Sequence, residues 1–262
     1  MPKSFHGTNV KIISITNQKG GVGKTTTAIH LADGLSRFHD KKVLAVDLDS
    51  QKNMSSVFVN TKEEWPKNSF SLFEAEPLTG EGLAQIRENF FLVPASIRLA
   101  EVDTMLAGKL DGFFRLREAL NRFASEFDYI VLDCPPALSM ITINAMVSAD
   151  YVVIPIQVSK FSIDGIQTIL DSISTTQKRY NPYLQLLGAV FCMHDTRTTL
   201  SKAMRPEVEK HLPVFQVEIP RSVVVEEAHL LRKTLFDYAP KHKATQKLKE
   251  FVEEALQKME AA

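Results

Sequence analysis

The chain has 262 residues, enough for one large domain with a hydrophobic core, and we expect residues 1–262 to form a single domain. Basic and acidic residues number 31 each, so the formal net charge is zero and bulk charge favours neither a nucleic-acid nor a membrane partner. The two cysteines, Cys134 and Cys192, are far apart in sequence, which excludes a disulfide framework and favours a reduced, cytoplasmic protein. No apolar run is long enough to span a membrane, and residues 1–9, which lack the apolar core of a signal peptide, are expected to be flexible.

The first strong pattern is a glycine-rich turn between a predicted strand, residues 10–16, and a predicted helix, residues 27–38. A strand, such a turn and a helix N-terminus form a phosphate cradle, because backbone N–H groups point inward and the helix dipole adds positive charge. Glycine lets the backbone approach the phosphates, Lys24 supplies a cation for them, and the Thr25 hydroxyl is placed to bind Mg²⁺. The turn reads Lys19-Gly20-Gly21-Val22-Gly23-Lys24-Thr25-Thr26.

The front of this turn departs from the general phosphate-loop pattern. That pattern has glycine six residues before the phosphate-binding lysine, where this chain has Gln18, and a second lysine, Lys19, comes next. Lys19 precedes the glycines, so it need not serve its own cradle and makes physical sense if it meets the phosphates of a facing subunit. The alternative is a glycine-rich turn that binds no nucleotide.

A second predicted strand, residues 43–49, carries two acidic residues at its end. Ligands of open α/β sheets bind at the carboxyl ends of the strands, so Asp47 and Asp49 are expected beside the glycine-rich turn. Their spacing of two puts both side chains on one side of an extended chain. An ordinary acidic turn after a strand is the alternative interpretation.

The middle of the chain is less regular. Residues 57–89 are broken by proline and glycine, so we expect loops and one or two short helices there. A short strand at residues 90–94 and a helical pattern over residues 99–123 follow. The next buried strand, residues 129–133, ends in Asp133, whose carboxylate is expected to hold a water of the Mg²⁺ shell, and Cys134 is expected to be a small buried residue.

The C-terminal half continues the alternation of strands and helices. Strands are predicted at residues 151–156, at residues 184–193 and before Pro220, and helices are predicted near Thr142 and at residues 163–173. The final amphipathic helix has a slightly acidic polar face, which favours packing in the core over binding to a membrane surface. The whole pattern predicts an α/β fold with a doubly wound, mostly parallel sheet flanked by helices.

These motifs resemble the ParA/MinD group of P-loop ATPases, which carries a deviant phosphate loop of the form Lys-Gly-Gly-x-Gly-Lys-Thr. The Asp-Cys-Pro-Pro segment after residue 132 and the Thr-Ile-Asn-Ala segment at residues 142–145 are typical of the ParA/Soj branch. In the first switch the group has Asp-x-Asp-Pro-Gln-Gly-Asn, where this chain has Ser50 and Lys52 in place of proline and glycine. The resemblance covers residues 11–251, nearly the full chain.

The resemblance implies a Mg²⁺-dependent, weak ATPase, stimulated by a partner, in a single P-loop domain. It implies that Lys19, Lys24 and Asp49 serve catalysis, with Lys19 reaching across an ATP-dependent homodimer. It also implies that Mg²⁺ is held by Thr25 and, through water, by Asp47 and Asp133. The implied nucleotide-binding residues are Lys19, Gly20, Gly21, Val22, Gly23, Lys24, Thr25, Thr26, Met193 and Pro220.

For partners, the resemblance implies non-specific DNA and a ParB-type protein that stimulates hydrolysis, in a cytoplasmic, nucleoid-associated protein that binds no membrane. Basic residues outnumber acidic ones between Arg197 and Glu250, so we expect a local basic patch in an otherwise neutral chain. The predicted DNA contacts are Arg197, Lys202, Arg205, Arg221 and Lys233.

Three alternatives share these motifs. A ParA-like protein can position another cargo, and only its partner would differ. A MinD-type division regulator would bind membranes. A metabolic ATP-dependent synthetase of the same P-loop class would need a pocket for an organic substrate, for which the sequence offers no motif.

Overall fold

The computed structural model describes residues 9–62, 64–74, 83–157, 162–194 and 199–261, and the predicted flexible segment lies, except for Asn9, outside them. Its centre is an eight-stranded sheet with the strand order β3-β4-β2-β5-β1-β6-β7-β8. All neighbouring strands pair in parallel except β3, which pairs antiparallel with β4 at one edge. The strands are β1 (Lys11–Ile15), β2 (Val43–Asp47), β3 (Ala84–Arg87), β4 (Phe90–Val93), β5 (Tyr129–Asp133), β6 (Tyr151–Gln157), β7 (Gln185–His194) and β8 (Val214–Pro220).

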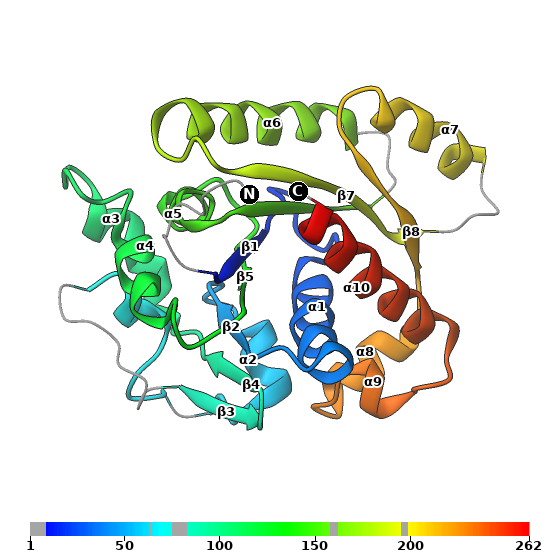
Figure 1. The fold of residues 1–262 in the computed structure, drawn as a ribbon, viewed down its shortest axis with the longest axis horizontal. Helices are drawn as coiled ribbons and strands as arrows, with labels where there is room; N and C mark the ends of the chain where they lie inside the picture. The colour runs from blue at the N-terminus through cyan, green and yellow to red at the C-terminus, as the bar shows by residue number, and fades with distance from the viewer. Residues whose placement is uncertain (1–8, 63, 75–82, 158–161, 195–198, 262) are drawn as a thin grey trace.

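Helices cover both faces of the sheet, which confirms the predicted doubly wound α/β class (Figure 1). The longer helices are α1 (Lys24–His39), α5 (Met140–Ser148), α6 (Ser162–Arg179), α7 (Thr199–Glu209), α8 (Val223–Leu230) and α10 (Lys243–Ala261). The shorter ones are α2 (Asn53–Phe58), α3 (Val102–Leu106), α4 (Arg115–Leu120), α9 (Leu235–Tyr238) and the 3₁₀ turns η1 (Ser69–Leu72), η3 (Ile97–Glu101) and η4 (Asn121–Phe123). Among the described residues, no helix is both long and apolar enough to cross a bilayer.

The apolar side chains of the strands divide between two cores. Ile12 and Leu44 belong to the core under α5, α6 and α7, whereas Ile13 and Val43 belong to the core under α1, α9 and α10. Alternate residues of a strand point to opposite faces, so strands buried on both faces are apolar throughout, as β1, β2 and β5 nearly are. In α1, a Cβ on Gly34 would come within 2.6 Å of Val252 in α10, so glycine permits the close packing of these two helices.

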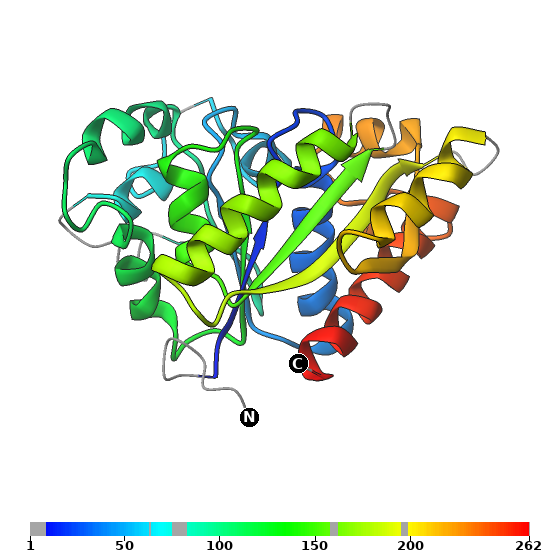
Figure 2. The ribbon, with the colours of Figure 1, turned by 90° about the horizontal axis from the view of Figure 1, so that it is seen from above.

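The topology places a crevice at the carboxyl ends of β1 and β5. From β1 the chain runs through α1 to β2, and from β5 it runs through α5 to β6 on the opposite face. Connections that leave adjacent parallel strands on opposite faces open a crevice where ligands of such sheets bind. In Figure 2 the loop after β1 and helix α8 lie at this edge, away from the described ends of the chain.

Candidate functional site

The glycine-rich turn joins β1 to α1, as predicted, and its backbone needs its glycines. Gly21 and Gly23 have positive φ angles of 70° and 94°, a conformation that costs other residues energy. A Cβ on Gly23 would also lie 3.1 Å from the Cβ of Cys192 in β7, closer than nine in ten real contacts. The turn is thus a preformed cradle at the N-terminus of α1, and it packs directly against Cys192 of β7.

The two lysines of the turn have different environments. Lys24 is only 6 % exposed, and its Nζ donates a hydrogen bond of 2.8 Å to the backbone oxygen of Lys19. Burial lowers the pKa of Lys24, and the negative charge of Asp133 partly offsets this shift. Lys19, by contrast, is exposed at the mouth of the cradle. Lys24 is therefore an internal cation, and Lys19 faces outward.

Asn17 braces the front of the turn, and the sequence motifs did not identify it. Its Oδ1 accepts a 3.0 Å hydrogen bond from the Lys19 N–H, and its Nδ2 donates a 2.7 Å bond to the backbone oxygen of Pro155 in β6. The side chain thus ties the turn to a strand that is distant in sequence.

Two aspartates lie side by side at the carboxyl ends of β2 and β5. Asp47 and Asp133 are paired in register, and both are fully buried. Asp47 accepts hydrogen bonds from the N–H and the hydroxyl of Ser55, at 2.8 and 2.6 Å, and from the N–H of Asp49 at 3.1 Å. Burial raises the pKa of Asp47 to about 6 although the Ser55 hydrogen bonds oppose the shift. The Asp47 carboxylate therefore fixes the backbone of the loop after β2, from Asp49 to Ser55.

Asp133 has a different environment. Neither of its oxygens accepts a hydrogen bond within the described part of the chain, although the Thr25 hydroxyl and the Lys24 ammonium lie near enough to lower its pKa. Burial, followed by the negative charge of Asp47, outweighs them and raises the pKa of Asp133 well above its usual range. A buried carboxylate without a donor, next to a threonine hydroxyl, fits a hard divalent cation such as Mg²⁺. The described residues contain no cluster of three or more His, Cys, Asp or Glu side chains that could hold a metal by themselves.

The third aspartate, Asp49, lies in the loop that leaves β2. It is 8 % exposed, and its Oδ1 accepts a 2.9 Å hydrogen bond from the N–H of Gln51. Lys52 follows with a left-handed φ of 58°, and its Nζ lies 2.6 Å from Glu64. The left-handed backbone explains why glycine suits this position in proteins that the first switch resembles.

Ser55 is the main site residue that sequence reasoning missed. It is completely buried in α2, and besides donating to Asp47 its hydroxyl accepts a 2.8 Å hydrogen bond from the N–H of Ala95, just after β4. Nothing in the local sequence distinguishes it from any other helix serine, because both partners are distant along the chain.

Met193 and Pro220, two of the implied nucleotide-binding residues, lie at the carboxyl ends of β7 and β8, where His194 pairs in register with Pro220. Met193 adopts a left-handed φ of 53° beside a shift in the strand register. The two residues thus share the edge that carries the cradle, while their contact with a nucleotide stays a prediction.

The predicted DNA contacts separate into three kinds. Arg221 and Lys233 are exposed on either side of α8.

Arg205 is engaged within the fold: its guanidinium pairs with Glu209 at 2.9 Å and Glu218 at 2.8 Å, and donates to the backbone oxygen of Phe215. These contacts favour a bracing role for Arg205 over a contact with DNA. The remaining two are Lys202, which belongs to α7, and Arg197, which lies outside the described residues.

The chain matches known proteins along most of its length. A family model described as an AAA domain matches residues 10–186. The chromosome-partitioning ATPase Soj of Thermus thermophilus is 37% identical over 255 residues, which cover 97% of this chain and 98% of the relative. The sporulation initiation inhibitor protein Soj of Bacillus subtilis is 35% identical over 239 residues, which cover 90% and 94%.

Solved structures of two other proteins have the same fold. Cobyrinic acid a,c-diamide synthase from Mycobacterium smegmatis, with a bound ATP analog and magnesium, superposes with a TM-score of 0.84 at 30% identity, covering 96% of both chains. A Cyanothece McdA–ATP complex superposes with a TM-score of 0.82 at 25% identity, covering 96% of this chain and 98% of the other.

Proposed function

Because this chain belongs to the Soj/ParA family of partitioning ATPases, we propose that it is a nucleotide-operated switch. Its cofactors are ATP and Mg²⁺, and in the ATP state a homodimer of single-domain chains, residues 1–262, binds DNA without sequence preference. A ParB-type partner stimulates hydrolysis and thereby releases the DNA. The observation that carries the proposal is the different burial of two lysines in one turn: Lys24 is buried inside the cradle, and Lys19 is exposed at its mouth.

The chain's own residues account for nucleotide binding and hydrolysis. The amides of the turn and the Lys24 ammonium bind the phosphates and stabilise the charge that develops on them in the transition state. When bound, Mg²⁺ would neutralise part of the charge of the phosphates. Thr25 and Asp133 would hold the ion, in line with the unsatisfied oxygens of Asp133. Asp49 orients the attacking water, since phosphoryl transfer requires mainly positioning.

Asp47 was also predicted to contact the metal shell through water. Its three hydrogen bonds to Asp49 and Ser55 support a positioning role, in which it fixes the backbone that carries Asp49. A carboxylate oxygen can accept more than one hydrogen bond, so a water of the metal shell is compatible with this arrangement.

The position of Lys19 supports the proposed dimer. Two anionic nucleotides that approach each other across a two-fold axis need additional positive charge, and an exposed lysine at the mouth of each cradle supplies it. The interface is then self-complementary, with each Lys19 directed at the nucleotide of the facing subunit. We propose a cytoplasmic, nucleoid-associated protein without membrane binding, in which Arg221 and Lys233 contact DNA phosphates.

Two substitutions test the switch by separating its steps. Lys19→Ala keeps the cradle, so it should bind ATP as a monomer and fail to dimerise. Asp49→Ala keeps both lysines and loses the group near the attacking water, so it should accumulate as an ATP-bound dimer. Light scattering with ATP and Mg²⁺, together with phosphate release, distinguishes them. Normal dimerisation of Lys19→Ala, or hydrolysis by Asp49→Ala at the parent rate, contradicts the assignment.

The alternatives differ in what they bind. A positioner of another cargo would keep ATP-dependent DNA binding and respond to a different partner, and a MinD-type regulator would float with lipid vesicles in ATP. One structural relative is named as a diamide synthase. An enzyme of that kind would turn over ATP only with an organic acid and an amide donor. The stronger sequence identity to Soj proteins favours partitioning.

A further inference from the structure

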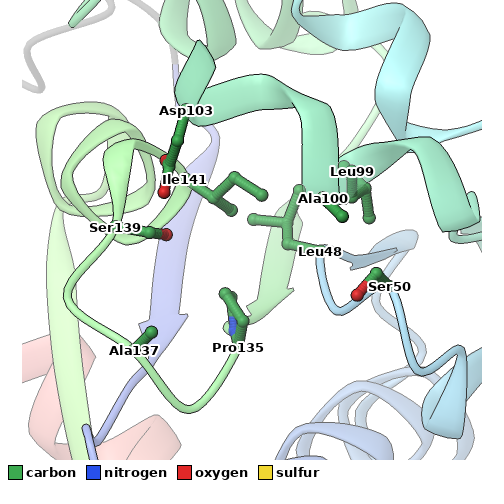
Figure 3. Close-up of a pocket in the computed structure, with 9 residues that line it drawn as sticks. All are labelled: Leu48, Ser50, Leu99, Ala100, Asp103, Pro135, Ala137, Ser139 and Ile141. Carbon is green, nitrogen blue, oxygen red and sulfur yellow. The ribbon is translucent and has the colours of Figure 1, made fainter.

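A small cavity lies between the two switch loops, beside the nucleotide site and outside the cradle (Figure 3). One wall comes from the loop after β2, and the opposite wall from the loop after β5 and the start of α5. Helical segments η3 and α3 close the third side. The lining residues are Leu48, Ser50, Leu99, Ala100, Asp103, Pro135, Ala137, Ser139 and Ile141.

Size and chemistry restrict what can enter. The cavity holds about 140 Å³, and Leu48, Leu99 and Ile141, all buried, give it an apolar floor. An apolar protein cavity of roughly 150 Å³ accepts a benzene ring, so this one has room for one leucine or phenylalanine side chain. It is too small for a cofactor or an extended organic substrate, because such pockets measure roughly 300–1,000 Å³.

The surroundings indicate that the side chain belongs to another protein. Leu138 is 43 % exposed and lies in sequence between two lining residues, Ala137 and Ser139. On the opposite wall, Ile97 is 67 % exposed two residues before the lining residue Leu99. Large apolar side chains exposed around an apolar hollow are typical of protein–protein contact sites. A free small molecule would leave both of these side chains uncovered.

The charge at the rim selects the partner's chemistry. Asp103 lines the cavity and is exposed, whereas the nearby charged groups of Arg98, Glu101 and Glu74 are paired with one another. We propose that the cavity receives one leucine- or phenylalanine-sized side chain that the activating partner presents next to a lysine or arginine. The apolar group fills the hollow, and the basic group meets Asp103. This inference rests on the proposed function, since it specifies how the stimulating partner docks.

The position of the cavity explains why such docking would affect hydrolysis. The loop that supplies Leu48 and Ser50 also carries Asp49, and the loop that supplies Pro135 and Ala137 begins at Asp133. A side chain wedged between the two loops therefore sets the separation of the carboxylates that orient water and hold Mg²⁺. Activation then needs no partner residue in the cradle itself.

Chemical filling of the cavity tests the proposal directly. Both native cysteines are buried, and burial raises their thiol pKa to about 12, so a new exposed thiol can be labelled selectively. In Ala100→Cys, N-phenylmaleimide places a phenyl group at the cavity. Because its cavity is already occupied, the labelled protein should need at least tenfold more of the ParB-type protein from the same genome for half-maximal stimulation. Unlabelled Ala100→Cys and labelled Leu110→Cys, whose side chain is fully exposed and does not line the cavity, should respond like the parent.

The possible results are distinct. Unchanged stimulation of labelled Ala100→Cys overturns the proposal, and loss of ATP-dependent dimerisation in light scattering assigns the cavity to a second copy and also overturns it. If the ParB-type protein fails to stimulate even the parent chain, the proposed partner is wrong and the docking proposal fails with it.

A second variant tests the charge at the rim. The Oδ1 of Asp103 accepts a 2.8 Å hydrogen bond from the N–H of Met140, and Asp103→Asn keeps this acceptor while removing the charge. The half-stimulating concentration of the ParB-type protein should rise severalfold, and its dependence on salt should weaken. The same concentration and salt dependence as in the parent would exclude the basic contact.

Discussion

At the residue scale, Ser55 is the hydrogen-bond partner that fixes Asp47 in the loop after β2. The Ser55 hydroxyl donates to Asp47 and accepts from the N–H of Ala95, so it joins α2 to the ends of two strands. A hydrogen bond to a charged group contributes about 1.5–3 kcal/mol, and a loss of 1.4 kcal/mol from the transition state slows a reaction tenfold. We expect Ser55→Ala to lower ATP turnover about tenfold and to raise the Mg²⁺ concentration needed for half-maximal activity.

Two further variants separate positioning from folding. Ser55→Thr keeps the hydroxyl and should retain most of the activity. Ser69→Ala removes another fully buried serine hydroxyl, which has no hydrogen-bond partner among the described residues, and should leave activity and Mg²⁺ dependence unchanged. Equal losses in Ser55→Ala and Ser69→Ala would show that the effect of Ser55 is only on stability.

Lys52 carries a backbone strain that glycine would relieve. A left-handed conformation costs a residue with a side chain roughly 1–2 kcal/mol, and the exposed ion pair with Glu64 returns at most about 1 kcal/mol. Lys52→Gly removes both contributions, whereas Lys52→Ala loses the ion pair and keeps the strain. In urea unfolding, Lys52→Gly should be more stable than Lys52→Ala by about 1 kcal/mol, and equal stabilities would contradict the strain.

Residues proposed to act through their own chemistry could be picked out from the sequence, and residues that position them through distant partners could not. Glycines before Gly23-Lys24-Thr25, and aspartates at strand ends, form patterns that phosphate and Mg²⁺ binding require. Asn17 instead braces the cradle through Pro155 in another strand, and Ser55 acts through Asp47 and Ala95. Sequence spacing cannot predict those contacts, because the partners are far apart in the chain and only the order of strands in the sheet brings them together.

At the element scale, α1 connects the cradle to α9 through a buried histidine. The Nε2 of His30 accepts a 3.0 Å hydrogen bond from the N–H of Leu235, so Nδ1 must carry the proton and donate to the backbone oxygen of Thr26 at 2.7 Å. Burial lowers the pKa of His30 to about 3, so the folded state keeps this ring neutral.

The lowered pKa of His30 makes the folded state less stable as the pH falls. Between pH 6.5 and about 3 the unfolded chain binds a proton at His30 that the folded chain does not, so the free energy of unfolding falls as the pH falls. Between pH 7.5 and pH 5 the expected loss from His30 is about 2 kcal/mol. In urea unfolding at these two pH values, the free energy of unfolding of the parent should fall by about 2 kcal/mol more than that of His30→Gln, whose side chain cannot titrate. Equal losses would show that His30 is protonated in the folded state.

Some elements were easier to predict than others. Parallel strands buried on both faces are continuous apolar runs, so β1, β2, β5 and β6 were found nearly to the residue. Strand β3 was missed because it is a short edge strand that pairs on one side only, and residues 57–89 were expected to hold loops and short helices. Helices α8 and α9 were not predicted either, since they are short and their positions depend on packing against α1 and α2.

At the scale of the whole molecule, the proposed functions share one edge of the sheet. The cradle, both switch loops and the start of α8 follow the carboxyl ends of the strands. Hydrolysis at this edge can therefore change the surfaces proposed to bind the second subunit, the partner and DNA without a change of fold. Neutral overall charge leaves DNA binding to a local basic surface, which dimerisation would double.

ATP is proposed to control DNA binding, and fluorescence anisotropy with a labelled duplex of arbitrary sequence measures this control. With Asp49→Ala, ATP and Mg²⁺ should give tight binding at low salt, and ADP should give little. Log affinity should fall with log salt by roughly 0.9 per phosphate contacted, and the double variant Arg221→Ala, Lys233→Ala should reduce the slope by about 2 per subunit, while Lys109→Ala should not. Equal binding in ATP and ADP, or none at low salt, would contradict the account.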